Sequence, residues 1–513
     1  MKFPVKQLVT SWVPITIAIL GFAGWPPQTA SAQVASPSAT AASPGAAAPA
    51  APSKAGDRME EILKLFQTHD YASIGPLLRT SFTPEFIAAQ GEGDFTSFLA
   101  DNMRRAGDIW RGKVRVEGND AIAFFQSNLT TRWGAITLTV EPNAPYRINA
   151  FQIQRANPPK GSAVPVPPSE KARLAQISAL ATKLAKAELF SGVVAIARND
   201  RPILTKAFGL ADRSFNVANA PDTRFAVGGI DKSFTAVAIA QLAEAGKLSY
   251  DDPLSKFLPY PDQANAGKIL IKHLLSNTSG LGDYLTDKFF TNVRRLRDVQ
   301  SYLSILDHKP PGFTPGTDWQ DSSIGYLLLG RVVEIASGED YYEYVQNHIF
   351  KPAGMEHSFQ DFLQRPNPKS AIRYEDYFSK DRFVTAIYGY ISPPPVRGAP
   401  DSATVATAED LVRFVAALRN GKLVSPATYQ LLTTAKPELH AKTYGYGFVT
   451  NKSAEEPRDI IGQVGDAPGI CADYALVRDL KEPYAIVVLS NTSTIGHAIV
   501  ENFVSLYSTM PAQ

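Results

Sequence analysis

The side chains best suited to acyl-transfer chemistry gather at two points of the chain. Lys232 and Ser233 are adjacent, and Ser322 and Ser323 directly follow Asp321. A serine hydroxyl attacks a carbonyl carbon when a neighbouring base removes its proton, and the carboxylate or the amine could act as that base for the serine pair. No histidine stands beside these serines, which favours a structural or substrate-contact role for Ser322 and Ser323.

Metal and redox chemistry find little support in the sequence. No His-x-x-x-His spacing occurs, and no carboxylates cluster around a histidine along the chain. Cys471 is the only cysteine, which excludes a CxxC motif and an intramolecular disulfide. We therefore predict no metal and no cofactor, and surface or packing roles for the scattered histidines His273, His348, His357, His440 and His497.

A series of short motifs follows one order through residues 223–469. The first is TRFAVGGIDKSFTA from Thr223, followed in register by GKLSYDDPL. The later ones are HLLSNTSGL from His273, PGTDW from Pro315, GYLLLG from Gly325, TAEDL from Thr407 and YGYGF from Tyr444. In this order the motifs resemble landmarks of the β-lactamase/penicillin-binding-protein family of serine hydrolases, of the D-alanyl-D-alanine carboxypeptidase and esterase type.

The resemblance implies a fold and a reaction. The fold is α/β, a β-lactamase-like antiparallel sheet flanked by helices plus a helical region. The family's Ser-x-x-Lys motif places nucleophile and amine on one helix face. Its Tyr-x-Asn motif adds a phenolic proton carrier and a substrate-holding amide. Its Lys-Thr-Gly or His-x-Gly motif, on an edge strand, aligns the substrate and completes an oxyanion hole with the backbone at the serine.

This sequence departs from the family at the first two motifs. Gly229 stands where the serine is expected, with Lys232 retained three residues later. Asp321 stands at the tyrosine position and Ser323 at the asparagine position. Glycine has no side chain that could attack or be acylated. Loss of the nucleophile alone typically costs on the order of a millionfold in turnover, so we predict that the family's mechanism is lost.

The third motif is also altered. It reads Gln463-Val464-Gly465, so the glycine is retained but an amide replaces the proton-donating or positive side chain. Asp466 replaces a usual small residue beside the expected oxyanion donor, and Pro468-Gly469 follows as in the family. We therefore expect no intact catalytic residue in the set of degenerate site positions Gly229, Lys232, Asp321, Ser323, Gln463 and Gly465.

Other polar groups near these positions have non-catalytic interpretations. Because the family counterparts of Lys232 and Asp321 face one another, we expect an ion pair that favours the charged form of each partner and removes the free base. Ser233 lies one turn deeper than Gly229 and is predicted to be a packed hydroxyl. The run Lys442-Thr443-Tyr444 suggests a Lys-Thr-Gly variant, but its place before the YGYGF landmark predicts a solvated strand edge.

The resembling motifs require a sheet assembled from both ends of a long domain, which we place at residues 170–508. Apolar residues at helical spacing predict a helix over 174–184, and a second helix is predicted from residue 495. Strands are predicted at 192–197, 470–477 and 484–489, and the region between these ends is expected to be mostly helical.

Residues 57–156 are predicted to form a small α+β accessory domain without a catalytic constellation. Apolar residues at 59, 62, 63 and 66 have helical spacing, and a second short helix is expected over 71–78. Strand-like runs follow at 114–116, 121–129, 136–140 and 146–153. Helices followed by an antiparallel sheet indicate the α+β class.

The N-terminus is predicted to direct export. Residues 1–32 combine two lysines, an apolar run and the Ala30-Ser31-Ala32 cleavage pattern of a signal peptide. Ser11 and Pro14 interrupt the apolar run, so no membrane span is expected after cleavage. The Ala/Pro/Ser-rich residues 33–56 and the Pro-rich residues 157–169 are predicted linkers. We expect a periplasmic or secreted protein.

Composition leaves three functions open. The 513 residues are 44% hydrophobic with a net charge of +2, which indicates a globular protein without a nucleic-acid partner. The first function is a non-catalytic pseudo-hydrolase whose cleft binds a peptide, a cell-wall fragment, a small molecule or a protein partner. The second is a rewired hydrolase that uses Ser322, Ser323 or a water activated by Asp321. The third is a purely structural exported protein.

Overall fold

The structure, a computed structural model, describes residues 54–156, 167, 169–360, 369–391, 393–451, 458–492 and 495–508. The predicted signal peptide and most of both predicted linkers lie outside these residues. Among the helices within the described ranges, none is long and apolar enough to cross a membrane. The chain divides into two compact units, which are treated separately below.

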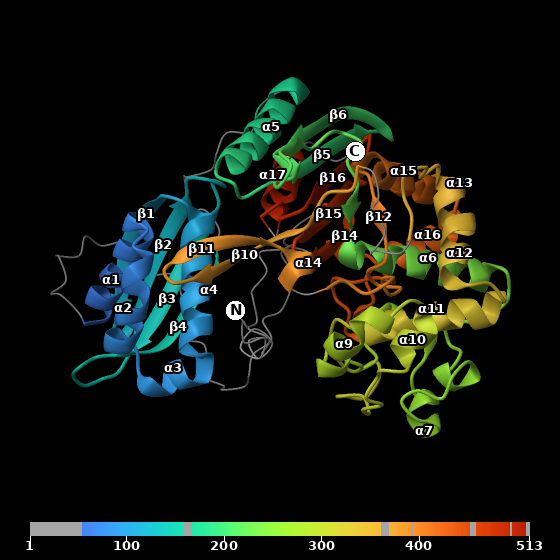
Figure 1. Ribbon diagram of the computed structural model, residues 1–513, viewed down its shortest axis with the longest axis horizontal. Coiled ribbons are helices and arrows are strands. Elements are labelled where there is room, and N and C mark those ends of the chain that lie inside the picture. The colour runs from blue at the N-terminus through green and yellow to red at the C-terminus, as the bar shows by residue number, and fades with distance from the viewer. Residues whose placement is uncertain are drawn as a thin grey trace. The chain divides into compact units, whose positions relative to one another are not determined.

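The first unit is a four-stranded antiparallel sheet in the order β1-β2-β3-β4, with helices packed on it (Figure 1). Residues of β2 alternate between buried and more exposed positions, as expected for a strand with one covered face. Phe125 of β2 thereby meets Phe66 of the first helix, with ring centroids 6.0 Å apart. The predicted order of helices before sheet is confirmed. The elements are α1 (Lys54–Thr68), η2 (Tyr71–Ser73), α2 (Ile74–Ser81), α3 (Pro84–Gln90), α4 (Glu92–Ala106), β1 (Ile109–Glu117), β2 (Asp120–Ser127), β3 (Trp133–Val140) and β4 (Ile148–Arg155).

A hairpin from much later in the sequence contributes to the first unit. Residues Tyr377–Val384, at the tip of this hairpin, group with the first unit. Phe378 and Phe383 contact Tyr71, with ring centroids 5.7 and 5.6 Å apart. The sequence analysis placed these residues in the long domain and did not predict the contact. The hairpin strands are β10 (Tyr374–Ser379) and β11 (Arg382–Ile387).

The second unit is organised around a six-stranded sheet in the order β13-β14-β15-β16-β5-β6, with antiparallel neighbours. The early strand β5 pairs with the late strand β16, and β6 extends the sheet beside β5, so the prediction of a sheet built from both ends of the domain is confirmed. Helices α5 and α17 contact each other and the sheet, and α15 packs on β5 and β16 (Figure 1). The bounds are α5 (Glu170–Lys186), β5 (Gly192–Arg198), β6 (Arg201–Phe208), α15 (Ala408–Arg419), β13 (Val449–Asn451), β14 (Ile460–Ala467), β15 (Ile470–Val477), β16 (Tyr484–Ser490) and α17 (His497–Ser508).

Helix α6 (Asp231–Glu244) is the central element of the helical region. Most of its residues are buried, both the apolar ones and the polar side chains of its first turns, Asp231, Lys232, Ser233 and Thr235. Phe234 packs edge-on against Phe350 and Phe414. The remaining helices and short strands are β7 (Leu210–Asp212), β8 (Val217–Ala218), β9 (Phe225–Ala226), η3 (Gly228–Ile230), η4 (Leu254–Lys256), α7 (Gln263–Ala266), α8 (Ile271–Leu275), α9 (Asp287–Asn292), η5 (Val293–Arg295), α10 (Val299–Leu303), α11 (Ser323–Ser337), α12 (Tyr341–Val345), η6 (Gln346–Phe350), α13 (Lys351–Ala353), α14 (Tyr388–Ile391), β12 (Val405–Ala406), α16 (Pro426–Thr433) and η7 (Pro437–Leu439).

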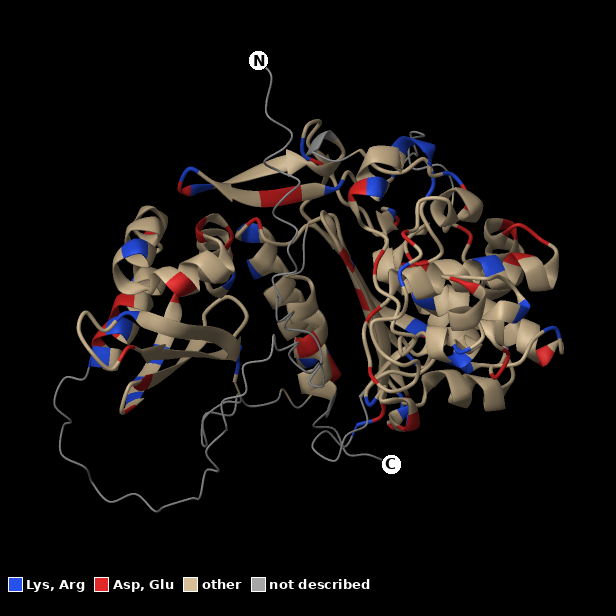
Figure 2. Cartoon of the chain, turned by 90° about the horizontal axis from the view of Figure 1, so that it is seen from below, with Lys and Arg blue, Asp and Glu red and all other residues tan. Residues whose placement is uncertain are grey.

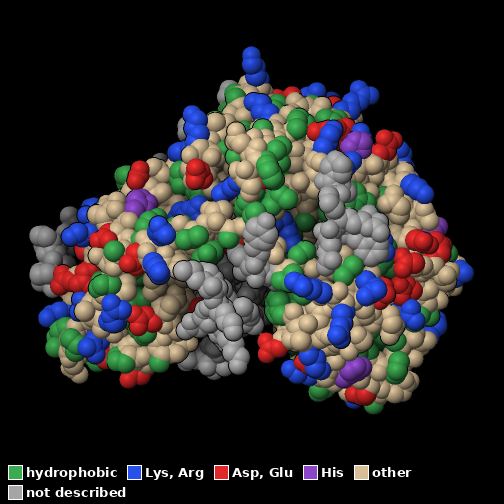
Figure 3. All heavy atoms as spheres, in the orientation of Figure 1, with side chains coloured by type: hydrophobic (Ala, Val, Ile, Leu, Met, Phe, Trp, Pro, Cys, Tyr) green, Lys and Arg blue, Asp and Glu red, His purple; other side chains and the backbone are tan. Residues whose placement is uncertain are grey.

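Charged side chains of both signs are intermixed within each unit. Figure 2 shows blue and red segments alternating along the described helices and hairpins. On the face drawn in Figure 3, small groups of hydrophobic side chains lie between charges of either sign. This distribution agrees with the near-neutral composition and does not form the single-sign stripe typical of polyanion-binding surfaces.

Candidate functional site

The turn before α6 lies directly against strand β14. Gly228 has a φ of +51° and faces Gly465, so that a Cβ at position 228 would lie 3.2 Å from the Gly465 carbonyl carbon. A Cβ at Gly229 would lie only 2.7 Å from the carbonyl oxygen of Val464. A Cβ at Gly465 would lie 1.8 Å from the oxygen of Val227. The three glycines therefore permit a backbone-to-backbone approach that leaves no room for a side chain at position 229 unless the strand moves.

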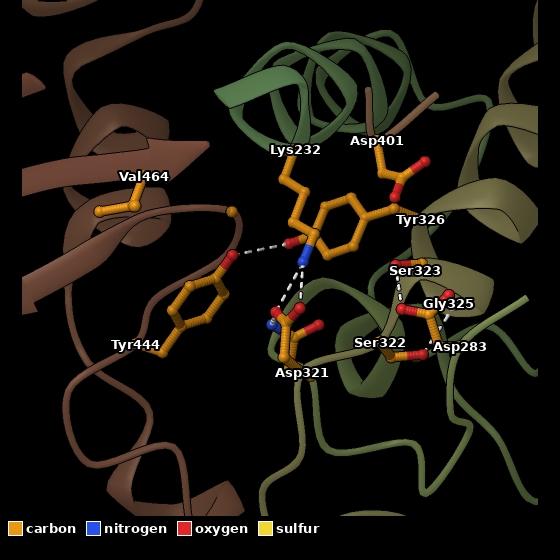
Figure 4. Close-up of polar contacts among 12 residues, drawn as sticks. Lys232, Asp283, Asp321, Ser322, Ser323, Gly325, Tyr326, Asp401, Tyr444 and Val464 are labelled. Atoms are coloured by element: carbon orange, nitrogen blue, oxygen red, sulfur yellow. Dashed lines mark hydrogen bonds and ion pairs between the residues drawn. The ribbon is translucent and has the colours of Figure 1, made fainter. Parts of the chain in front are cut away.

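Lys232 and Asp321 form the ion pair that the sequence analysis predicted (Figure 4). The Lys232 ammonium nitrogen lies 2.6 Å from each carboxylate oxygen, and Asn277 Nδ2 donates to Oδ1 of the same carboxylate at 2.9 Å. The Lys232 side chain is 9% exposed, whereas that of Asp321 is 45% exposed. Burial lowers the pKa of Lys232, but attraction to Asp321 opposes it and the net pKa is raised. The amine is therefore held protonated.

Two buried phenols, which the sequence analysis did not assign to the site, lie beside this pair. The hydroxyl of Tyr444 accepts a hydrogen bond from Gln463 Nε2 at 2.9 Å and lies 3.4 Å from the hydroxyl of Tyr326. Tyr326 donates to the carbonyl of Leu275 at 2.7 Å. Burial raises the pKa of both phenols, so neither supplies a phenolate near neutral pH. Tyr444 belongs to the YGYGF motif, but no motif spacing predicts its hydrogen bond with Gln463.

Two of the candidate serines serve structural purposes. The Ser322 hydroxyl caps α11 by accepting from Gly325 N at 2.9 Å, and it donates to the carbonyl of Gly282 at 3.0 Å. The Ser233 hydroxyl donates to the carbonyl of Gly447 at 2.8 Å and is fully buried. Both hydroxyls are thus satisfied by backbone groups, as predicted for packed serines.

Among the candidate serines of the site, Ser323 is the one whose hydroxyl bonds a carboxylate. Its hydroxyl donates to Oδ2 of Asp283 at 3.1 Å (Figure 4). Burial raises the pKa of Asp283, and the same carboxyl accepts from the backbone of Leu285. Asp283 did not feature in the sequence analysis, because it lies 40 positions from Ser323 and belongs to no motif of the family.

A cavity of about 240 Å³ adjoins this part of the site. Asp283 and Ile324, which flank Ser323, both line it, together with two tyrosine rings and a second acidic side chain. One of these tyrosines, Tyr284, donates its hydroxyl proton to buried Asp401 at 2.7 Å. Burial raises the pKa of Asp401 to about 6. The cavity is therefore apolar in part and lined by charged side chains of both signs, Asp283, Asp307 and Lys309.

His497 is buried, in surroundings that its position in the sequence does not predict. His497 is buried between two carboxylates: its Nε2 lies 2.8 Å from Asp466, and its Nδ1 lies 2.8 Å from Asp473. The side chain of Asp466 thus points toward His497 and away from the backbone around Gly465. The partners lie far apart in the sequence, so spacing along the chain could not reveal the cluster.

Four more of the seven histidines in the chain fit the prediction of surface or packing roles. His273 accepts from the backbone of Leu270 in the buried start of α8, and the remaining three lie at exposed positions, His348, His357 and His440. Lys442 is exposed as predicted, but it lies in a turn instead of a strand edge, and Tyr444 of the same run is buried.

Comparison with known proteins establishes the family. The sequence model described as Beta-lactamase matches residues 177–503. Because this match covers more than half of the chain, the protein belongs to the β-lactamase family, as the resemblance implied. The fold of the second unit, an antiparallel sheet flanked by helices with a helical region, agrees with that assignment.

Similar proteins carry penicillin-binding names. The chain is 36% identical over 262 residues to the putative penicillin-binding protein PbpX of Bacillus subtilis, covering 50% of this chain and 62% of that protein. It is 29% identical over 320 residues to penicillin-binding protein 4* of the same organism, covering 59% of this chain and 68% of that protein. Thus the chain spans less than two thirds of PbpX.

Solved structures agree in fold. A penicillin-binding protein from Bacillus halodurans is 29% identical, with a TM-score of 0.56, covering 66% of this chain and 98% of that one. FmtA from Staphylococcus aureus is 21% identical, with a TM-score of 0.54, covering 69% of this chain and 92% of that one. At that identity the second likeness concerns the fold alone.

A buried carboxyl beside Lys232 makes stability depend on pH. Asp231 is fully buried, accepts from Thr404 N at 2.8 Å and Gln360 Nε2 at 3.0 Å, and also bonds the Thr404 hydroxyl. Burial raises the pKa of Asp231 to about 7. A raised carboxyl pKa means that the folded state holds the proton more tightly than the unfolded state. Its stabilising contribution is therefore complete below about pH 4 and is lost as pH rises through about 7.

We expect Asp231→Asn to remove this titration. The free energy of unfolding of the variant should exceed that of the natural protein by up to about 4 kcal/mol more at pH 8 than at pH 4. Urea unfolding at both pH values measures the difference. Parallel pH profiles for the two proteins would show that Asp231 does not titrate in this range.

We expect Asp321→Asn to destabilise the second unit by about 1–3 kcal/mol at pH 7, because it leaves the Lys232 ammonium without its counter-charge. The range allows for the partial exposure of Asp321. Asp318→Asn, at an exposed neighbouring position, is the matched control and should be neutral. Urea unfolding of both variants tests the ion pair, and equal stability would contradict its contribution.

Proposed function

We propose that this protein is an exported, non-catalytic member of the β-lactamase family that binds a ligand in the former hydrolase cleft. The observation that carries the proposal is the 2.7 Å separation between a Cβ at Gly229 and the Val464 carbonyl oxygen. A serine at this position would collide with backbone, and glycine itself offers no nucleophile. The packing around position 229 thus leaves no space for a side chain, which agrees with the glycine found there.

The surrounding charges support the same proposal. Acyl transfer needs a group that accepts a proton and later returns it. Lys232 is held protonated by Asp321, and Gln463 is an amide engaged with Tyr444 and Gly447. These groups satisfy one another, so the site resembles a closed hydrogen-bonded network more than a poised acid–base pair.

The ligand in this proposal is a peptide or a cell-wall fragment that carries an amino group. The relatives named as penicillin-binding proteins favour cell-wall peptides. The half-exposed carboxylate of Asp321 favours a cationic group on the ligand, and the Asp283 carboxyl lines the adjoining cavity together with Lys309. Export rests on the N-terminal sequence pattern and on the same relatives.

A fluorescent penicillin tests the proposal directly. We expect the natural protein to remain unlabelled after denaturing electrophoresis, because no side chain at position 229 can be acylated. A Ser-x-x-Lys penicillin-binding protein labelled in parallel is the positive control. A stable covalent label on the natural chain would overturn the proposal. Non-covalent binding is measured by calorimetry with a peptide ending in D-alanyl-D-alanine, and Asp283→Asn should weaken it.

Gly229→Ser should restore no detectable labelling and should cost about 1–3 kcal/mol of stability through overpacking against Val464. Gly282→Ser is the matched control, because a Cβ at Gly282 meets nothing within 4 Å. Penicillin labelling and urea unfolding of both variants provide the readouts. Rapid acylation of the Gly229→Ser protein would show that the site retains its proton carriers.

A rewired hydrolase is the second candidate, and the contact between Ser323 and Asp283 favours it. A water activated by Asp321, with its half-exposed carboxylate, is the alternative within this candidate. Hydrolysis of a generic ester that disappears in Ser323→Ala or Asp321→Ala, but survives in the exposed control Ser304→Ala, would establish it. The primary proposal expects no ester hydrolysis above a mock purification for any of these proteins.

A further inference from the structure

Strands β14 and β15 place side chains on both faces of the large sheet. Tyr474 of β15 lies 3.0 Å from Ser233 of α6, whereas the preceding residue, Asp473, meets His497 of α17. Successive side chains of a strand point to opposite faces. The group around His497 therefore lies on the face away from α6 and is separate from the candidate functional site.

Three potential metal ligands of different kinds meet on this second face. Asp466 and Cys471 are paired across β14 and β15, and His497 is the first residue of α17. His497 Nε2 lies 2.8 and 2.9 Å from the two oxygens of Asp466 and 3.7 Å from the sulfur of Cys471. All three ligand atoms lie within 4.8 Å of one another.

These separations fit the edges of a tetrahedral zinc site. With Zn–N of about 2.0 Å and Zn–S of about 2.3 Å, the nitrogen–sulfur edge is about 3.5 Å and the nitrogen–oxygen edge about 3.3 Å. The observed nitrogen–sulfur separation is close to the first value. The shorter nitrogen–oxygen separation requires an opening of a few tenths of an ångström. Carboxylate, thiolate and imidazole are all ordinary zinc ligands.

The histidine is oriented as metal-bound histidines are. Its other ring nitrogen, Nδ1, lies 2.8 Å from Oδ2 of Asp473, a residue only 2% exposed. A carboxylate on the far nitrogen fixes the tautomer and aims the ligating nitrogen at the metal. The second oxygen of Asp473 is buried and has no hydrogen-bond partner among the described residues.

The local backbone makes room for the sulfur. A Cβ at Gly496 would lie 2.8 Å from the sulfur of Cys471, so any larger residue there would displace the thiol. Two carboxylates, those of Asp466 and Asp473, face the single imidazole, and buried charge requires compensation.

We propose that Asp466, Cys471 and His497 bind one Zn²⁺ ion, with Asp473 positioning the imidazole and solvent supplying a fourth ligand. Binding releases two protons to solvent, the thiol proton of Cys471 and the Nε2 proton that faces Asp466 in the unbound imidazolium of His497, because a thiolate and a neutral imidazole nitrogen are the ligands. The ion would fasten α17 to two strands of the sheet. The alternative is a metal-free site in which the histidine lies between two carboxylates. That arrangement does not require the thiol of Cys471.

Zinc content and cobalt substitution test the site on the full mature chain. After removal of metal with a chelator and dialysis against ZnCl2, we expect one zinc per chain by mass spectrometry of the element. Replacement by Co²⁺ should produce thiolate-to-cobalt charge-transfer absorption. X-ray absorption of the zinc-loaded protein should show a single sulfur neighbour at about 2.3 Å. Absence of stoichiometric zinc, or of sulfur from its coordination shell, would overturn the proposal.

Substitutions of the proposed ligands distinguish zinc binding at this site from adventitious zinc binding elsewhere. Cys471→Ser and Asp466→Asn should each reduce zinc affinity at least tenfold and abolish or shift the cobalt absorption. His348→Gln, at an exposed histidine, is the control and should leave both unchanged. For the natural protein, zinc at about a hundred times its Kd should raise Tm by about 5 °C. Equal zinc affinity in Cys471→Ser and the natural chain would place the metal elsewhere.

Discussion

The close approach between strand β14 and the turn before α6 constrains everything around the candidate site. Backbone atoms of the strand occupy the space that a side chain at Gly229 would need, and the contact exists because Gly228 and Gly465 also lack side chains. In a fold that performs acyl transfer, this gap must admit a nucleophile and a carbonyl group. Here backbone atoms of the strand fill this gap, so a substitution that adds a hydroxyl at position 229 would also have to displace the strand.

The polar groups around this contact bind one another through an ion pair and hydrogen bonds. A lysine left alone in a buried pocket would lose its charge or destabilise the fold, whereas Asp321 gives Lys232 a partner and joins Asn277 to the same carboxylate. The amide of Gln463 similarly bridges Tyr444 and the Gly447 carbonyl. Such mutual satisfaction stabilises a fixed arrangement, while catalysis needs a group that changes protonation during the reaction. This difference favours binding over turnover.

Sequence reasoning succeeded where local pattern or motif order carries the information. Period-2 alternation predicted β3, a strand-like apolar run predicted β15, and family register brought Lys232 and Asp321 together although they are 89 positions apart. It failed where contacts depend on how distant elements pack. The hairpin tip at Tyr377–Val384 joins the first unit through aromatic contacts that no motif encodes. The surroundings of His497 depend on strand register and on where the last helix begins.

Strand β14 links the candidate site to the cluster on the opposite face. Its Gly465 touches the turn before α6, and the next residue, Asp466, reaches His497 on α17. Consecutive residues of a strand cannot shift independently, because the ladder to β15 fixes their spacing. Any ion or ion pair that holds Asp466 therefore also holds the strand against Gly229. The contact between β14 and the turn before α6 is consequently supported from behind the sheet as well as by the glycines at the contact itself.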